Sequence, residues 1–212
     1  MEVKIWSDVR CPFCYIGKRK FEAALAGFAH KDEVTITWKS FELDPNIQTV
    51  EDTNIYDYFA NAKGIPHTQA VEMFDNVTRV AAEVGLEFKL DKSVVANSFN
   101  AHRLIQLAKT KGMGNEIEEE LFKIHFMEGK NIDDEGVLIS AGANIGIPEA
   151  EIVALLESDD FDADVRIDQL EAQRIGIRGV PFFVFDDKYA VSGAQAPEVF
   201  LQTLDKAWDS KI

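Results

Sequence analysis

The two cysteines of the chain are the residues best suited to do chemistry. Cys11 and Cys14 are the only cysteines among 212 residues, and they stand at C-x-x-C spacing in the segment Cys11-Pro12-Phe13-Cys14. A thiolate can attack a disulfide, and a second thiol three residues away can resolve the mixed disulfide that forms. We therefore expect Cys11 to be the attacking thiol and Cys14 the resolving thiol of a redox-active pair.

A zinc site and a pair of inert core thiols are the two alternatives. Structural zinc needs four ligands, commonly supplied as two pairs of Cys or His. The histidines are scattered along the chain, without H-x-x-x-H spacing: His30, His67, His102 and His125. The sequence therefore predicts no metal within one chain, although a site shared between two chains stays open. Two inert cysteines would fall only by chance at C-x-x-C spacing and between a predicted strand and a predicted helix.

A strand and a helix must position the two thiols. Residues 2–7 alternate apolar and polar side chains, which predicts a strand, and residues 12–28 show helical periodicity. Pro12 suits the first helical position, where a missing N–H costs nothing. The unpaired N–H groups of the first turn carry partial positive charge, which favours a thiolate at Cys11. The basic run 18–20 on this helix is interpreted as a solvated face.

A second structured segment lies near the C-terminal end. Residues 177–185 predict a strand with Gly179-Val180-Pro181 near its start. Proline is tolerated there because the first residue of a strand need not donate to the ladder. The other elements expected near the two ends are strands at 34–41 and 189–192, a turn at 186–188, and helices at 162–176 and 197–208.

The middle of the chain predicts helices and almost no strands. The fold class is therefore α/β, with an inserted all-helical domain at 51–156 and the other domain formed by 1–50 and 157–212. His102 falls in an apolar helical stripe and is interpreted as a packed or solvent-edge residue, with a contact to substrate or thiolate as the alternative. The expected helices are 54–62, 66–84, 93–111, 114–125, 135–144 and 148–156.

Composition restricts the partners and the location. Lys plus Arg number 22 and Asp plus Glu number 37, which gives a net charge of 22 − 37 = −15. Such a charge repels nucleic acid and anionic membranes, so neither is expected as a partner. No apolar run approaches the ~18 residues of a membrane-spanning helix, and no signal peptide is recognised. We expect a cytoplasmic protein, in which paired cysteines are more often catalytic than structural.

These motifs together resemble the DsbA family of thioredoxin-fold oxidoreductases, and in particular its cytoplasmic FrnE-like subgroup. The resemblance is carried by Cys11-Pro12-Phe13-Cys14, by Val180-Pro181, and by three flanking segments, Ser7-Asp8, Tyr15-Ile16-Gly17 and 191–195. It implies a thioredoxin-like fold with an inserted all-helical domain. It also implies a cis-proline loop at Val180-Pro181 that packs against the dithiol. Pro12, Phe13, Val180 and Pro181 are then the expected substrate-binding residues.

The leading hypothesis is a protein-disulfide oxidoreductase. We expect no metal and no cofactor; the redox-active group is the Cys11–Cys14 disulfide, and glutathione is a possible co-substrate. The alternative is a glutathione-dependent isomerase or transferase, since 2-hydroxychromene-2-carboxylate isomerase and kappa-class glutathione transferases are related. Those enzymes typically carry serine at the position of Cys11, so the two thiols favour exchange chemistry. A third hypothesis is a non-enzymatic partner-binding protein that uses a Phe-rich helical block. The expected substrate is a protein or small molecule that bears a disulfide or a thiol. The expected reductant is glutathione or a thioredoxin-type protein. The chain is expected to be a monomer or a homodimer.

Overall fold

The computed structural model describes residues 1–51 and 53–210 of the chain. The backbone divides into two units, one formed by Met1–Leu43 with Ala163–Ile212 and the other by Asp44–Asp162. The domain boundaries at residues 50 and 157 stay a prediction. Residues 52, 211 and 212, which the predicted domains include, lie outside the described residues.

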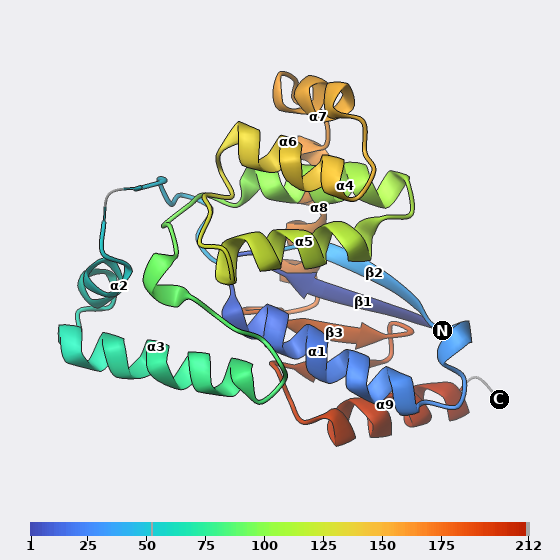
Figure 1. Ribbon diagram of the computed structural model, residues 1–212. Coiled ribbons are helices and arrows are strands. Elements are labelled where there is room, and N and C mark those ends of the chain that lie inside the picture. The colour runs from blue at the N-terminus through green and yellow to red at the C-terminus, as the bar shows by residue number, and fades with distance from the viewer. Residues whose placement is uncertain (52, 211–212) are drawn as a thin grey trace. The chain divides into compact units, whose positions relative to one another are not determined.

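The first unit is built on a four-stranded sheet (Figure 1). β1 (Glu2–Ser7) and β2 (Thr35–Ser40) are parallel and are joined by α1 (Pro12–Gly27). β3 (Phe182–Phe185) pairs antiparallel with β1, and β4 (Tyr189–Ser192) pairs antiparallel with β3. Two parallel neighbours need a crossover connection, which is why a helix separates β1 from β2. The strand order is β2-β1-β3-β4, and the predicted α/β class is confirmed.

The turn between β3 and β4 lies where the sequence predicts it. Asp186 and Asp187 both have positive φ, at 47° and 54°. Two consecutive residues with positive φ make a tight turn whose twist matches that of the flanking strands, and aspartate tolerates this conformation better than most residues. The turn therefore fixes the register in which Phe185 faces Tyr189.

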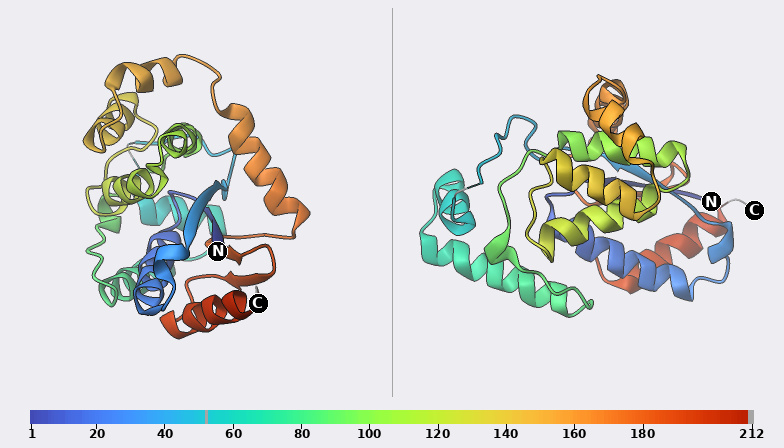
Figure 2. Two further views of the ribbon diagram at one scale, coloured as in Figure 1. Left: turned by 90° about the vertical axis from the view of Figure 1, so that its right-hand side faces the viewer. Right: turned by 45° about the horizontal axis from the view of Figure 1, so that its top comes forward.

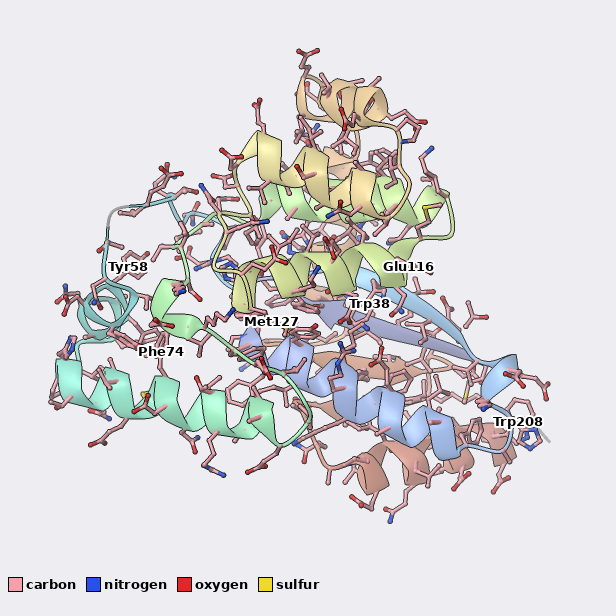
Figure 3. The ribbon with its side chains drawn as sticks, in the orientation of Figure 1. Trp38, Tyr58, Phe74, Glu116, Met127 and Trp208 are labelled. Atoms are coloured by element: carbon pink, nitrogen blue, oxygen red, sulfur yellow. The ribbon has the colours of Figure 1, made fainter. Side chains whose placement is uncertain are left out.

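Aromatic residues form the core on one face of the sheet. Phe183 and Phe185 point to this face because side chains alternate along β3. Phe21 of α1 lies 5.6 Å from Phe183 between ring centroids, and Phe200 of α9 (Pro197–Asp209) lies 4.7 Å from it. Figures 1 and 2 show α1 and α9 side by side on this face, in agreement with their contacts. At the end of α9, Trp208 (labelled in Figure 3) stacks on His30 at 4.1 Å.

The opposite face of the sheet is covered by α8 (Asp162–Arg174) (Figure 2). Trp6 and Val184 form a buried apolar cluster there with Ala172. A buried carboxylate at Asp168 fixes the helix to β2, since one oxygen lies 2.8 Å from Lys39 Nζ and the other accepts from the Ser40 amide at 3.0 Å. Burial of a carboxylate is tolerated because both oxygens are paired.

The second unit is helical over most of its described length, as predicted. In the hairpin of the first two helices, Phe74 (labelled in Figure 3) contacts Tyr56 and Phe59 at centroid distances of 5.2 Å and 5.3 Å. His102 is buried, which confirms its interpretation as a packed residue. The helices are α2 (Ile55–Lys63), α3 (His67–Ala82), α4 (Phe99–Thr110), α5 (Gly114–Phe126), α6 (Glu135–Asn144) and α7 (Glu149–Leu156), with short 3-10 turns at η1 (Lys31–Glu33) of the first unit and η2 (Leu90–Lys92).

Two predicted boundaries of helices and strands are wrong by five residues or more, whereas the others differ by one or two residues or agree. α4 begins at Phe99 and not at residue 93, because the preceding segment is held extended: the Val50 amide donates to the Val95 carbonyl, and the Asn97 side-chain amide donates to the Ile47 carbonyl. β3 begins at Phe182 and not at residue 177, since the intervening residues form a loop. Within the described part of the chain, no helix is both long and apolar enough to cross a membrane.

Candidate functional site

The dithiol segment lies at the junction of β1 and α1, as the sequence predicts. Cys11 is the N-cap residue of α1, with extended backbone angles, and Pro12 takes the first helical position. The Cys14 amide donates to the Cys11 carbonyl at 2.9 Å, so the two cysteines are separated by the first helical turn. The N-terminal N–H groups of a helix favour negative charge nearby, and Cys11 stands at this end.

A buried aspartate shapes the loop before Cys11. Asp8 is fully buried, and its carboxylate accepts hydrogen bonds from the Arg10 amide at 3.1 Å and the Leu43 amide at 2.8 Å. The Asp8 carbonyl in turn accepts from the Cys11 amide at 2.9 Å. The side chain of Asp8 thus fixes the loop between Asp8 and Arg10, and the Asp8 carbonyl holds Cys11 at the helix end.

The two thiols are both free and occupy different environments. Cys11 is 5% exposed and Cys14 is 1% exposed. Burial raises the pKa of Cys14 well above its usual value, and hydrogen bonding to Cys11 and the charge of Cys11 raise it further. The backbone amide of Asp8 and the hydroxyl of Ser7 act in the opposite direction and lower the pKa of Cys14. Cys14 is therefore a neutral thiol at neutral pH, poised beneath Cys11.

The proline loop meets the dithiol. The Val180–Pro181 peptide bond is cis, and the Val180 carbonyl accepts a hydrogen bond from the Cys11 thiol at 3.6 Å. The Pro181 carbonyl accepts from the Gly193 amide at 2.8 Å, which ties the loop to the end of the β3–β4 hairpin. The structure thus brings together Cys11, Cys14, Val180 and Pro181 within the first unit.

A glycine on α1 makes this approach possible. A Cβ at Gly17 would lie 2.9 Å from Cγ of Pro181 and 3.5 Å from Cζ of Phe183. Contacts below 3.0 Å force the neighbour to move, and a proline ring cannot move away by changing rotamer. Gly17 therefore sets how closely the proline loop packs on the dithiol helix.

We expect the Gly17→Ala variant to lose disulfide-exchange rate without unfolding. The added methyl group overpacks the contact at a cost of about 1–3 kcal/mol, while alanine recovers about 1 kcal/mol of helix propensity. Stability should therefore change little, but Pro181 should shift relative to Cys11. The matched control is Gly27→Ala on the same helix, where the new Cβ meets nothing within 4 Å. Urea unfolding and an insulin-reduction assay check both variants, and equal activity in the two would contradict the role of Gly17.

The remaining predicted site residues divide between surface and core. Phe13 is 40% exposed beside the thiols, and it extends from the first turn of α1. Phe182, the first residue of β3, is partly buried and packs against the apolar cluster that includes Trp6 and Ala172. The interpretation of residues 18–20 as a solvated face is wrong for Lys18, which is 2% exposed and ion-paired with Glu22 at 2.5 Å.

No metal-binding cluster is found in the part of the chain that the structure describes, where no three His, Cys, Asp or Glu side chains come together to hold an ion. The roles of Cys11, Cys14, Pro12, Phe13, Val180 and Pro181 as site residues stay predictions. Two further residues shape the site in ways that the sequence does not predict. Gly17 packs against Pro181, and the Asp8 carboxylate accepts from the Arg10 and Leu43 amides. The spacing of Gly17 three residues after Cys14 places it on the same face of the helix, but its close approach to Pro181 is visible only in the structure.

Comparison with known proteins identifies the family. The family model described as DSBA-like thioredoxin domain matches residues 2–205. The crystal structure of the probable DsbA oxidoreductase SCO1869 from Streptomyces coelicolor is similar, with 37% sequence identity, a TM-score of 0.93, and coverage of 99% of this chain and 90% of that one.

Two more distant structures share the fold. The cytosolic disulfide reductase DsbM from Pseudomonas aeruginosa, solved with GSH, is 17% identical at a TM-score of 0.67, with 99% of this chain and 100% of that chain covered. A 2-hydroxychromene-2-carboxylate isomerase is 15% identical at a TM-score of 0.67, with 99% and 95% covered. The expected thioredoxin-like, DsbA-like fold is confirmed, and the chain belongs to the family of DSBA-like thioredoxin domains.

Proposed function

We propose that this protein is a thiol–disulfide oxidoreductase that works through the Cys11-Pro12-Phe13-Cys14 segment. The observation that carries the proposal is the pairing of two free thiols at the N-terminus of α1 with the Val180 carbonyl, 3.6 Å from the Cys11 sulfur. An attacking thiol at a helix end, a buried thiol one turn further on and a bent prolyl peptide beside them are what disulfide exchange needs. The chain belongs to the family of DSBA-like thioredoxin domains, and a similar protein of that fold is described as a probable DsbA oxidoreductase, which supports redox chemistry in general terms.

The reaction proceeds in two exchange steps. The Cys11 thiolate attacks one sulfur of a substrate disulfide R–S–S–R′, forms the Cys11–S–S–R mixed disulfide, and releases R′–S⁻, which takes up a proton. Cys14 then attacks Cys11 Sγ, which breaks the bond to R and releases R–S⁻ as a second thiol. The substrate gains two electrons and two protons, and the dithiol loses both. Two thiols of an external reductant restore the pair and are themselves oxidised to a disulfide.

The substrate surface is proposed to be Pro12, Phe13, Val180 and Pro181. Phe13 is a large apolar side chain that stands exposed beside the thiols. When the Cys11 thiol is consumed, the Val180 carbonyl loses its donor and becomes an acceptor for an extended partner chain, as in strand addition. Glutathione or a thioredoxin-type protein is the proposed reductant. A cytoplasmic location is part of the proposal, and DsbM, which shares the fold, is described as cytosolic.

The alternative function is a glutathione-dependent isomerase or transferase, whose chemistry does not need two thiols. The likeness to the 2-hydroxychromene-2-carboxylate isomerase is one of fold. A Cys11→Ser/Cys14→Ser double variant separates the two functions, because disulfide exchange is lost in it whereas glutathione-dependent turnover would persist.

The proposal is tested with the unmodified protein. Oxidised glutathione should convert the reduced chain to a form that lacks two hydrogen atoms by intact mass, through a Cys11–Cys14 disulfide that peptide mapping locates. The protein should also accelerate the reduction of insulin by dithiothreitol, and iodoacetamide treatment of the reduced chain should abolish this effect. Absence of an internal disulfide, together with no acceleration of insulin reduction, would overturn the proposal.

A further inference from the structure

The outer face of α8 carries exposed apolar side chains. The inner face of this helix packs on the sheet and buries Val165 and Ala172 (Figure 2). On the side that faces solvent, Ile167 is 57% exposed and Leu170 is 49% exposed, and Ile175, directly after the helix, is 53% exposed. A helix that packs only on its own sheet normally carries polar residues on the opposite face. Exposed apolar side chains gathered in this way are typical of a surface that contacts another protein.

These side chains follow one line along the helix. Ile167 and Leu170 are three residues apart, while Ala163 lies four residues before the first and Arg174 four residues after the second. Residues at spacings of three and four are neighbours on a helix surface. The line Ala163-Ile167-Leu170-Arg174, here called the α8 stripe, therefore spans the whole helix, which is about 20 Å long at the rise of an α-helix.

The charged residues on the surface of α8 divide into those that are paired and those that are not. Arg166 and Glu171 form ion pairs inside the first unit. The side chains of Asp164 and Arg174 are exposed and make no hydrogen bond or ion pair with any residue that the structure describes. Asp164 borders the α8 stripe three residues before Ile167, and Arg174 ends it. The stripe is thus apolar in the middle, with an acidic residue at one end and a basic residue at the other.

We infer that the α8 stripe is the contact surface of a homodimer, in which the α8 helices of two copies pack antiparallel about a twofold axis. This arrangement places Ile167 against the partner subunit's Leu170, and Asp164 against the partner subunit's Arg174. Each contact occurs twice, because both copies use the same surface. The N-terminal end of one helix also meets the C-terminal end of the other, so the helix dipoles attract. A second copy of α8 in the reverse direction therefore matches the stripe in both polarity and charge.

The dimer is expected to be reversible and to leave the dithiol uncovered. A contact made by one helix of each copy is smaller than the roughly 800 Å² per partner of a typical stable interface, and the net charge of −15 on each copy opposes association. We therefore expect a dissociation constant in the micromolar range. Because α8 covers the face of the sheet opposite to α1, whose N-cap is Cys11, the inference goes beyond the proposed function and does not depend on it.

Sedimentation velocity of the full chain under reducing conditions, over a series of protein concentrations, measures the association. The parental protein should change from monomer to dimer as its concentration rises through the micromolar range. Ile167→Glu should weaken association by about tenfold or more, because the dimer would then bury two carboxylates against leucine. Val199→Glu is the matched control and should associate as the parental protein does, since Val199 is an exposed apolar residue on α9 of the same unit.

Charge reversal tests the antiparallel direction. Asp164→Arg and Arg174→Asp each place like charges opposite one another at both ends of the helix pair, and each should raise the dissociation constant about five- to tenfold. The double variant Asp164→Arg/Arg174→Asp puts opposite charges together again and should return the dissociation constant to within about twofold of the parental value. A helix that is merely destabilised by one substitution would not be rescued by the other.

The outcomes separate the dimer from the proposed function. A parental protein that stays monomeric at every concentration would overturn the inference, and so would a dimer that survives Ile167→Glu or a charge reversal that the double variant does not rescue. Should Ile167→Glu fold poorly, the charge reversals decide, because both positions are exposed. Monomeric variants should react with Ellman's reagent at the parental rate, so a protein without exchange activity would count against the proposed function and not against the dimer.

Discussion

Replacing either cysteine by serine is expected to stop turnover, but at different points of the cycle. In Cys11→Ser no thiol attacks the substrate, because Cys14 is 1% exposed and burial holds its pKa well above the usual value. The rate of insulin reduction should fall to that of dithiothreitol alone. In Cys14→Ser the attacking thiol remains, so a mixed disulfide should form and persist. Serine fills nearly the same volume as cysteine, so the fold should be kept in both variants.

The two variants are distinguished by trapping. A protein substrate with a single free thiol, converted by Ellman's reagent to its mixed disulfide with 5-thio-2-nitrobenzoate, should react with Cys11 of Cys14→Ser. Release of 5-thio-2-nitrobenzoate should leave a stable disulfide-linked adduct that a non-reducing gel displays. Cys11→Ser should form none at comparable times. The double variant provides the background. An adduct on Cys11→Ser that forms as fast as on Cys14→Ser would reverse the roles assigned to the two thiols and contradict the mechanism.

The asymmetry between the thiols has a direct physical origin in the fold. Cys11 stands at the N-cap, beside the loop that carries Val180, whereas Cys14 is enclosed one helical turn further on. Removing a thiolate from water disfavours its charged form, and a second charge near Cys11 disfavours it again. Burial, the largest cause of the raised Cys14 pKa, acts throughout, whereas the contribution of Cys11 is removed once Cys11 is engaged in a mixed disulfide. Attack by Cys11 therefore precedes attack by Cys14, because Cys11 stands at the helix end and Cys14 is buried one turn further on.

Much of this site could be predicted because its determinants are local. The C-x-x-C spacing and Pro12 at the first helical position are properties of a few neighbouring residues, and the structure shows that helix start as expected. Strand alternation and the paired aspartates of the turn likewise depend on short-range geometry. Local patterns of this kind determine where a helix or strand begins and ends, as long as no contact with a distant segment overrides them.

The parts that could not be predicted depend on distant contacts. Residues 93–98 have a sequence compatible with helix, but the bridge from Val95 to Val50 and the bond from Asn97 to Ile47 hold them extended. Lys18 looks like a surface residue in a basic run, yet it is buried and paired with Glu22. The approach of Gly17 to Pro181 joins segments far apart in the chain, so helical spacing alone could not reveal it.

The largest stability effect is expected at Arg103 in the helical unit. Its side chain is 5% exposed, and its guanidinium closes the C-terminal end of α7. Nη2 donates to the Leu155 carbonyl at 2.7 Å and to the Ser158 carbonyl, and Nε donates to the Asp160 carbonyl at 3.0 Å. The last carbonyls of a helix have no partner within the helix, so this arginine supplies a donor to the Leu155 carbonyl of α7 and donors to two carbonyls just beyond the helix end.

The Arg103→Met variant should therefore lose about 1.5–3 kcal/mol of unfolding free energy, since it removes the hydrogen bonds of a buried charged group to three backbone carbonyls. The Leu155 carbonyl keeps the Ser158 amide and hydroxyl as donors, and the Asp162 carboxylate, 2.7 Å from Nε, is 42% exposed and can turn to water. Methionine retains the apolar volume of the arginine side chain's aliphatic part, so the loss of stability reports the guanidinium.

Arg79→Met is the matched control, because Arg79 is 65% exposed and pairs with Glu83 on the surface of α3, where an ion pair contributes about 0.2–1 kcal/mol. Urea unfolding of the full chain, with hydrogen exchange read at α7, measures both variants. A loss at Arg103 no larger than at Arg79 would show that other groups satisfy the end of α7, and the guanidinium would not be what holds α4 to α7.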